Sequence, residues 1–107
     1  MADVFVHVVL MTFHSNVSAE KREAMRTKQE GLGALCGGRE AGILYWRSGW
    51  NLDQRKNYHL MEFGIFADAD AFQRYRIHPA HMAFAQEMGE LADWVVGNID
   101  AVLPGFG

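Results

Sequence analysis

The stretch of residues 4–13 constrains the fold more than any other part of the sequence. It reads VFVHVVLMTF, so apolar side chains occupy both sets of alternating positions, and His7 is the lone polar group in the odd-numbered row. Successive side chains of a strand point to opposite faces of the sheet, so a strand that is apolar in both rows is covered on both faces. We therefore expect a central strand with a layer of protein on each side.

Hydrophobic spacing and turn residues predict the remaining elements. N-cap chemistry and helical spacing predict three helices. The first covers residues 18–35, the second runs from Asp68 or Asp70 to Ile77 or His78, and the third covers residues 79–91. The second and third form a pair that is bent at His78–Pro79. Alternating runs predict strands at residues 42–50, 57–66 and 94–103. The resulting order is that of a ferredoxin-like βαββαβ sandwich, an α+β fold with an antiparallel sheet.

Helices cover only one face of such a sheet, so the opposite face needs a partner. We expect that face to be an apolar patch too large for a monomer. The sequence therefore predicts a homodimer in which two sheets face each other, and it leaves residual space between sheet and helices as a pocket. The side chains expected on the uncovered face are Phe5, His7, Val9, Phe13, Met61 and Phe63.

Length, charge and cysteine content limit the classes of binding partner and the cellular compartment that we expect. The chain has 107 residues and no linker-like stretch, which predicts a single domain over residues 1–107. Its net charge of −3 offers no basic footprint for nucleic acid. No positively charged leader precedes the first strand, and no apolar run approaches the ~18 residues that span a membrane. The single cysteine, Cys36, cannot form an internal disulfide, which favours a reducing, cytoplasmic location.

Two histidines sit in apolar rows of predicted strands. His7 lies on the first strand and His59 on the third, and these strands are neighbours at the centre of a ferredoxin-like sheet. The two imidazoles are therefore expected within reach of one another. The alternative for each is a core histidine that is hydrogen-bonded to a neighbour.

The run of residues 75–81, YRIHPAH, holds the densest cluster of polar aromatic side chains. His81 is the one strongly polar residue in an otherwise apolar helical stripe that includes Phe84, so we expect it to face the sheet. We expect His78 to cap the helix that begins at Pro79. A metal site is not predicted, because Pro79 breaks the spacing of the two histidines and no carboxylate lies close by in sequence.

Glu62 is a carboxylate in the middle of an apolar strand. One interpretation is a cross-strand pair with Arg47, and the other is a buried carboxylate that orients an imidazole. The sequence contains no glycine-rich phosphate loop and no G-x-S-x-G motif, so nucleotide use and serine hydrolysis are not predicted.

Taken together, the first strand with its central His7, the segment His59-Leu60-Met61-Glu62 and the run YRIHPAHMAF resemble the stress-responsive dimeric α/β-barrel (Dabb) family. The resemblance covers residues 4–103, and its most specific part is the His-Pro-Ala-His-x-x-Phe run. It implies ferredoxin-like protomers that pair into a dimeric α/β barrel. Most members have no established activity, but one, a plant polyketide cyclase, performs an intramolecular aldol condensation without a cofactor.

The resemblance also implies roles for individual residues. By position, His81 would be the general base and Tyr75 the hydrogen-bond donor, acting without a cofactor on a small hydrophobic carbonyl compound. A neutral imidazole can deprotonate a carbon flanked by carbonyls, and a phenol can stabilise the enolate oxygen. The residues expected to line the substrate pocket are His7, His59, Val9, Met11, Met61, Phe63 and Phe84.

Two other functions stay open at this point. The bulky side chains of Met11, Phe13, Met61 and Phe63 favour a filled cavity, and hence a non-catalytic, stress-responsive ligand-binding or structural dimer. The third possibility is a cofactor-free or haem-linked monooxygenase on a related dimeric fold, although no residue is visibly dedicated to haem. Between the first two, the joint presence of four polar aromatic residues favours a cyclase, lyase or isomerase.

Overall fold

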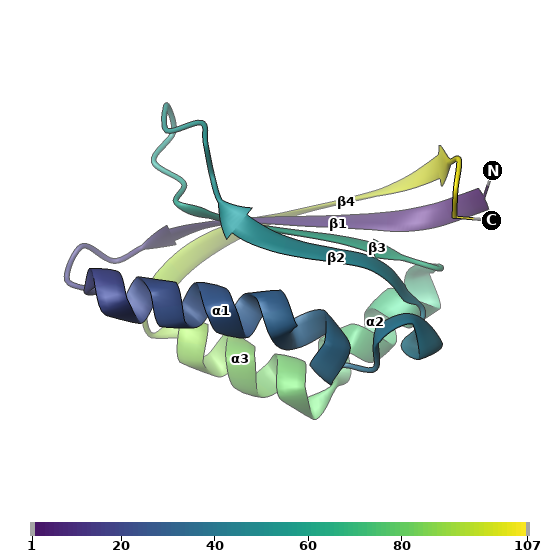
Figure 1. Cartoon of the computed structure of the whole chain (residues 1–107), viewed down its shortest axis with the longest axis horizontal. Helices are drawn as coiled ribbons and strands as arrows, with labels where there is room; N and C mark the ends of the chain where they lie inside the picture. The colour runs from purple at the N-terminus through teal and green to yellow at the C-terminus, as the bar shows by residue number, and fades with distance from the viewer. Residues whose placement is uncertain (1, 107) are drawn as a thin grey trace.

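The computed structural model describes residues 2–106 and shows a four-stranded sheet with all helices on one face (Figure 1). The antiparallel strands run in the order β2-β3-β1-β4. This is the predicted ferredoxin-like α+β fold; the ends of the predicted domain, Met1 and Gly107, lie outside the described residues. Along the chain, the elements are β1 (Ala2–Phe13), α1 (Ala19–Leu35), a 3-10 turn (Gly38–Ala41), β2 (Ile43–Trp50), β3 (Leu60–Phe66), α2 (Ala69–Ile77), α3 (Pro79–Gly89) and β4 (Ala92–Leu103).

Side chains at the helix starts fix where each helix begins. The Ser18 hydroxyl accepts a hydrogen bond from the backbone of α1, and Asp68, rather than Asp70, caps α2. His78 Nδ1 accepts from the Ala80 amide at 3.0 Å, and Pro79 occupies the first position of α3. The predicted cap at His78 and the bent helix pair are confirmed. Such caps satisfy amides that have no partner within the helix.

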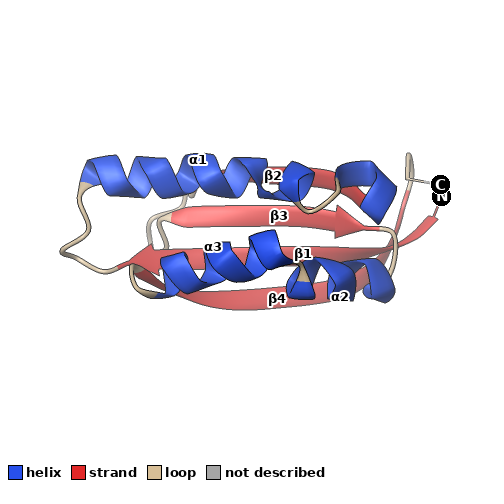
Figure 2. Cartoon of the chain, turned by 90° about the horizontal axis from the view of Figure 1, so that it is seen from below, coloured by secondary structure: helices blue, strands red, loops and turns tan. Residues whose placement is uncertain are grey.

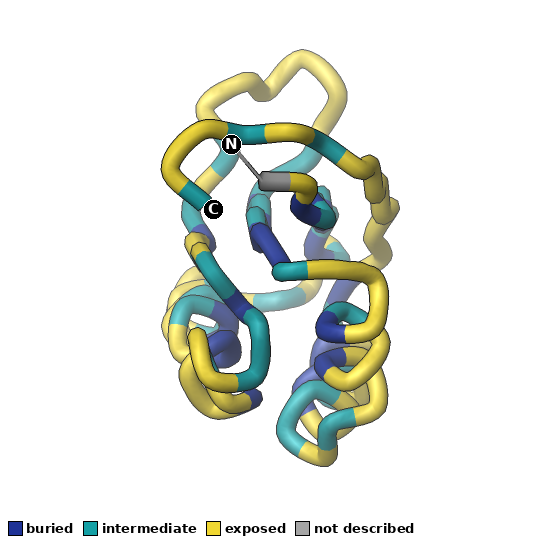
Figure 3. The backbone as a smooth tube through the Cα atoms, turned by 90° about the vertical axis from the view of Figure 1, so that its right-hand side faces the viewer, coloured by how far each residue is buried: buried dark blue, intermediate teal, exposed yellow. Residues whose placement is uncertain are grey.

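The helices divide the covered face of the sheet between them. Figure 2 shows α1 running along β2 and β3, while α2 and α3 run along β1 and β4. The core fills the space between these layers, and Figure 3 shows the buried parts of the chain facing that space. Its most deeply buried side chains include Met25 and Leu32 of α1, Phe66 of β3 and Met88 of α3.

The register of β1 against β3 corrects the predicted assignment of sheet faces. Val8 lies opposite Phe63 and Leu10 lies opposite Met61. Residues directly opposite one another in an antiparallel pair share a face, so the uncovered face carries the even-numbered row of β1 together with Met61 and Phe63. The prediction was wrong for the other four residues, which belong to the helix-covered face: Phe5, His7, Val9 and Phe13.

The physical reason for this error lies in the composition of β1. Both of its rows are apolar, and alternation alone says which residues share a face but not which face meets the helices. The uncovered face is nonetheless apolar, as expected. Ile65 is buried there in a cluster joined by Phe106, and β4 adds Val95 and Ile99, which are exposed.

Two glycines near the end of α1 provide a matched test of the packing between α1 and β2. A Cβ at Gly33 would lie 2.6 Å from Cγ of Trp46, whereas a Cβ at Gly31 meets nothing within 4 Å. The Trp46 ring cannot easily withdraw, because its Nε1 donates to the Gln29 carbonyl at 2.9 Å.

We therefore expect opposite effects of alanine at these two positions. Gly31→Ala should raise the free energy of unfolding by about 0.5–1 kcal/mol, because alanine is the better helix former. Gly33→Ala should lower it by about 1–2 kcal/mol, because overpacking outweighs the gain in helix propensity. Urea denaturation of the two variants checks this, and equal effects would contradict the packing described here.

Candidate active site

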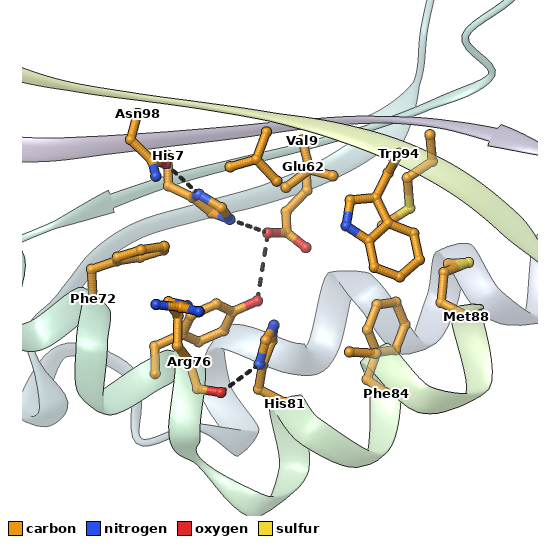
Figure 4. A pocket seen from close by; sticks show the side chains of 14 residues that line it. His7, Val9, Glu62, Phe72, Arg76, His81, Phe84, Met88, Trp94 and Asn98 are labelled. Atoms are coloured by element: carbon orange, nitrogen blue, oxygen red, sulfur yellow. Dashed lines mark hydrogen bonds and ion pairs between the residues drawn. The ribbon is translucent and has the colours of Figure 1, made fainter.

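A cavity of about 420 Å³ lies between the sheet and the helix pair α2–α3 (Figure 4). Its size falls in the range of small-molecule sites, and it combines an apolar lining with a few convergent polar groups. The lining residues are His7, Val9, Met11, Glu62, Phe72, Tyr75, Arg76, His81, Phe84, Ala85, Met88, Trp94, Val96 and Asn98.

The sheet wall of the cavity carries a buried polar cluster. His7 Nε2 lies 3.1 Å from Glu62 Oε2, and His7 Nδ1 lies 2.7 Å from Asn98 Oδ1. Glu62 is only 3% exposed and His7 only 5%. Both partners of the ring are oxygen atoms, which suits an imidazolium that donates from both nitrogens and pairs with the Glu62 carboxylate.

The strand register brings this cluster together. His7 on the central strand lies opposite Gly64 of β3 and Asn98 of β4, and Glu62 is two residues along β3 from Gly64. The imidazole therefore has a polar neighbour on each side. Of the two interpretations of Glu62, the carboxylate that orients an imidazole is confirmed. The pair with Arg47 is wrong, because Arg47 lies opposite Phe63 on the uncovered face, near Glu30 instead.

The helix wall contributes Tyr75 from α2 and His81 from α3. The Tyr75 hydroxyl, on a residue only 2% exposed, donates to Glu62 Oε2 across a long 3.5 Å. The Tyr75 and His81 rings lie 4.4 Å apart between centroids. Burial raises the pKa of Tyr75, and the negative charge of Glu62 raises it further. Tyr75 is thus held as a neutral hydrogen-bond donor.

The break between α2 and α3 sets the tautomer of His81. In an uninterrupted helix, the Arg76 carbonyl would accept from the Ala80 amide. Here that amide donates to His78 Nδ1 instead, and His81 Nδ1 lies 2.9 Å from the Arg76 carbonyl oxygen. A carbonyl can only accept, so Nδ1 of His81 carries the hydrogen. When the ring is neutral, its Nε2 lone pair is the free one, and Figure 4 shows that end of the ring directed toward the sheet wall.

Most of the residues predicted to form the site meet in this cavity, and three do not. His7, Val9, Met11, Tyr75, His81 and Phe84 all line it. Met61 and Phe63 point away from it, for the reason of register given above.

His59 also lies elsewhere, in the loop before β3. Its Nδ1 accepts from the Phe13 amide at 3.0 Å, and its Nε2 lies 3.1 Å from Asn57 Oδ1. Burial and the positive charge of Arg22 lower the pKa of His59. The expectation that His7 and His59 meet is wrong, because the antiparallel register sets His7 opposite Gly64, whereas His59 precedes Leu60, the partner of Met11. His59 is therefore bound at the far end of β1.

Sequence reasoning missed several lining residues. Asn98 gives no distinct signal as a polar residue of the last strand, although its position in the row of Trp94 and Val96 could have placed it beside them. Arg76 gave no signal of its own, because charged residues usually occupy the solvated face of a helix. The others missed were Phe72, Ala85, Met88, Trp94 and Val96.

The family model of the stress-responsive A/B barrel domain (Dabb) matches residues 5–100. The chain belongs to this family. An uncharacterised protein of Streptomyces coelicolor is 30% identical over 95 residues, which are 88% of this chain and 96% of that relative.

Two solved structures illustrate how widely the fold is used. A dimeric ferredoxin-like protein of unknown function from Thermobifida fusca is 21% identical, with a TM-score of 0.79 over 94% of this chain and 93% of that chain. A hydroxynitrile lyase from Passiflora edulis is 17% identical, with a TM-score of 0.79 over 94% of this chain and 97% of that chain. These two likenesses concern the fold alone.

Two features are absent from the described residues, 2–106. No helix among them is long and apolar enough to cross a membrane. Nor do they contain a group of three or more His, Cys, Asp or Glu side chains placed to hold a metal ion.

Alkaline stability tests the burial of Tyr75. The pKa of Tyr75 is raised in the folded protein, whereas in the unfolded chain a tyrosine ionises near its ordinary value of about 10. Above that pH the unfolded state loses a proton that the folded state keeps, so this residue makes the free energy of unfolding fall by about 1.4 kcal/mol per pH unit. Tyr75→Phe should remove that share of the decline.

Urea denaturation at a series of pH values above about 9 measures the decline. Tyr58→Phe is the matched control, because Tyr58 lies in the partly exposed loop before β3, outside the cavity, and loss of its hydroxyl should leave the decline unchanged. If Tyr75→Phe and the wild type declined equally, the burial of Tyr75 described here would be contradicted.

Proposed function

We propose that the protein is a cofactor-independent enzyme of the cyclase, lyase or isomerase kind, acting on a small apolar carbonyl compound. The observation that carries the proposal is the hydrogen bond between His81 Nδ1 and the Arg76 carbonyl, which leaves Nε2 of His81 free beside the buried hydroxyl of Tyr75. A base with a fixed tautomer and a neutral donor next to it are the two groups that enolisation requires.

In the proposed reaction, Nε2 of the neutral His81 removes a proton from a carbon that is flanked by carbonyls. The electron pair of the broken C–H bond moves into the adjacent carbonyl, and the resulting enolate oxygen accepts a hydrogen bond from Tyr75. The long contact between Tyr75 and Glu62 makes this hydroxyl available for redirection. In a cyclisation, the enolate carbon then attacks a second carbonyl of the same molecule, and the oxygen of that carbonyl takes the proton from the His81 imidazolium. In an isomerisation, the imidazolium instead returns the proton to a different carbon of a conjugated enolate.

The apolar part of the lining supports this chemistry. Met11, Phe84 and Trp94 surround the space with low-polarity surface, which suits an apolar substrate. A walled cavity also holds a flexible chain in a conformation in which its reacting carbons are close together. The lyase from Passiflora edulis adds the support that an enzyme exists on this fold.

The first experiment is deuterium exchange at the acidic carbon of benzoylacetone, a neutral β-diketone with an apolar ring, followed by NMR in deuterated buffer. We expect the wild type to accelerate exchange over buffer. His81→Ala should lower the acceleration by about 100-fold or more, because it removes the base. Tyr75→Phe should lower it by about 10-fold or more, because it removes the donor to the enolate oxygen.

His14→Ala is the matched control, because His14 lies outside the cavity beside Asp93. It should leave the exchange rate unchanged. Equal rates for a folded His81→Ala variant and the wild type would refute the role of His81. No acceleration by the wild type, together with a raised melting temperature in the presence of the diketone, would favour the alternative of a non-catalytic binding protein.

We further propose that two copies pair through their uncovered sheet faces. That face is apolar across all four strands, from Tyr45 of β2 through Phe63 and Val8 to Ile99 of β4. A contiguous apolar surface of this kind is unfavourable in water and typical of an interface. The relative from Thermobifida fusca, which is described as dimeric, supports the same assembly.

A pair of isoleucine variants tests this assembly. Ile99 on the uncovered face is 64% exposed and Ile77 on α2 is 62% exposed. Ile99→Lys should shift the protein toward monomer in sedimentation velocity at micromolar concentration, because it buries a charge in the interface. Ile77→Lys adds the same charge on the helical side and should leave the dimer intact. A wild-type protein that sediments as a monomer would overturn the proposal.

A further inference from the structure

The cavity is polar at one end and apolar at the other. Figure 4 shows His7 and Asn98 with Arg76 at one end, and Trp94, Phe84 and Met88 at the other. A ligand that fills the space in full therefore meets different chemistry along its length.

Among the described residues that line the cavity, Arg76 alone carries a permanent positive charge. Glu62, the carboxylate of the same lining, is already paired with His7, so it does not occupy the guanidinium. Within residues 2–106, no carboxylate lies within ion-pairing distance of Arg76. Its side chain is held by a neutral partner, because Nη1 donates to the amide oxygen of Gln73 at 3.2 Å.

The main chain ties Arg76 to the proposed base. The Arg76 carbonyl accepts from His81 Nδ1, and both side chains line the same cavity, so a ligand group bound by this guanidinium is held in the space that the imidazole faces. The residue is exposed, which keeps the guanidinium hydrated at the cavity mouth and limits the desolvation cost of pairing it with an anion.

We propose that Arg76 selects substrates that carry a carboxylate at one end. The substrate is then an amphiphilic molecule. Its carboxylate pairs with the Arg76 guanidinium, its enolisable carbonyl lies next to His81 and Tyr75, and its apolar group packs against Trp94 and Met88. The placement of the carbonyl next to His81 and Tyr75 rests on the proposed function, whereas the binding of a carboxylate by Arg76 does not. A guanidinium matches a carboxylate in charge and in planar, two-pronged geometry.

The number of cationic groups favours a carboxylate over a phosphate. One guanidinium balances a single negative charge. The other positive feature near this end, the start of α3, is already occupied, because the Ala80 amide donates to His78. A doubly charged phosphate would therefore keep one negative charge without a cationic partner.

The test compares the binding of succinylacetone, a β-diketone that ends in a carboxylate, with the binding of its primary carboxamide. Dissociation constants are measured by isothermal titration calorimetry. We expect the wild type to bind the carboxylate about 10-fold more tightly, a difference of about 1.4 kcal/mol. Arg76→Met should abolish this preference, and Arg76→Lys should retain part of it because the charge remains but the planar geometry is lost.

Arg74→Met is the matched control. Arg74 lies on the same helix and its guanidinium donates to the Ala41 carbonyl, away from the cavity. It removes the same charge from the protein and should leave the preference intact. A preference lost equally in Arg74→Met would reveal a general charge effect and overturn the proposal, as would equal affinities, or no binding of either compound, in the wild type.

His81→Ala separates this proposal from the proposed function. The variant retains Arg76 and should keep the preference for the carboxylate even though exchange at the diketone carbon is lost. If the wild type showed the preference but failed to accelerate exchange, the anion site would stand and the proposed catalysis would fail.

Discussion

The antiparallel register of β1 between β3 and β4 is the constraint on which the rest of the structure depends. It places His7 between Glu62 on one side and Asn98 on the other, on the face that the helices cover. A shift by one residue would turn His7 to the uncovered face and break its buried pair with Glu62, at a cost of about 3–5 kcal/mol. The pair of His7 and Glu62 therefore favours the observed register over a shifted register that would bury the other apolar row of β1.

The fold could be predicted from the sequence because its local signals agree with one another. Ser18 and Asp68 cap helices where the apolar spacing begins, and Pro79 starts a new helix after a residue that cannot continue the old one. The faces of the sheet could not be predicted, because they depend on the pairing of β1 with β3. An apolar residue in either row of β1 satisfies local preference equally well, so only tertiary packing decides which row meets the helices.

The candidate site was predictable where one of its residues is a polar residue in an otherwise apolar row of a strand or helix. His7 and His81 stand out in this way, and both line the cavity. His59 stands out equally, yet it lies outside the cavity, because the register of β3 against β1 places it beside Phe13 at the far end of β1. Arg76 and Asn98 are polar residues in unremarkable surroundings, and their placement follows only from the way α2 and β4 lie against β1.

The interruption of the helix at His78 and Pro79 makes the tautomer of His81 independent of the side chains that shape the cavity. The free nitrogen of His81 is defined by a backbone oxygen, whereas the shape of the cavity is defined by side chains on β1, β4 and α3. Substitutions of the wall can therefore alter which molecule is accepted without reassigning the proton on the imidazole. The position of the imidazole proton and the shape of the cavity are thus encoded in separable parts of the chain, so this scaffold can accommodate ligands of altered shape while His81 keeps its tautomer.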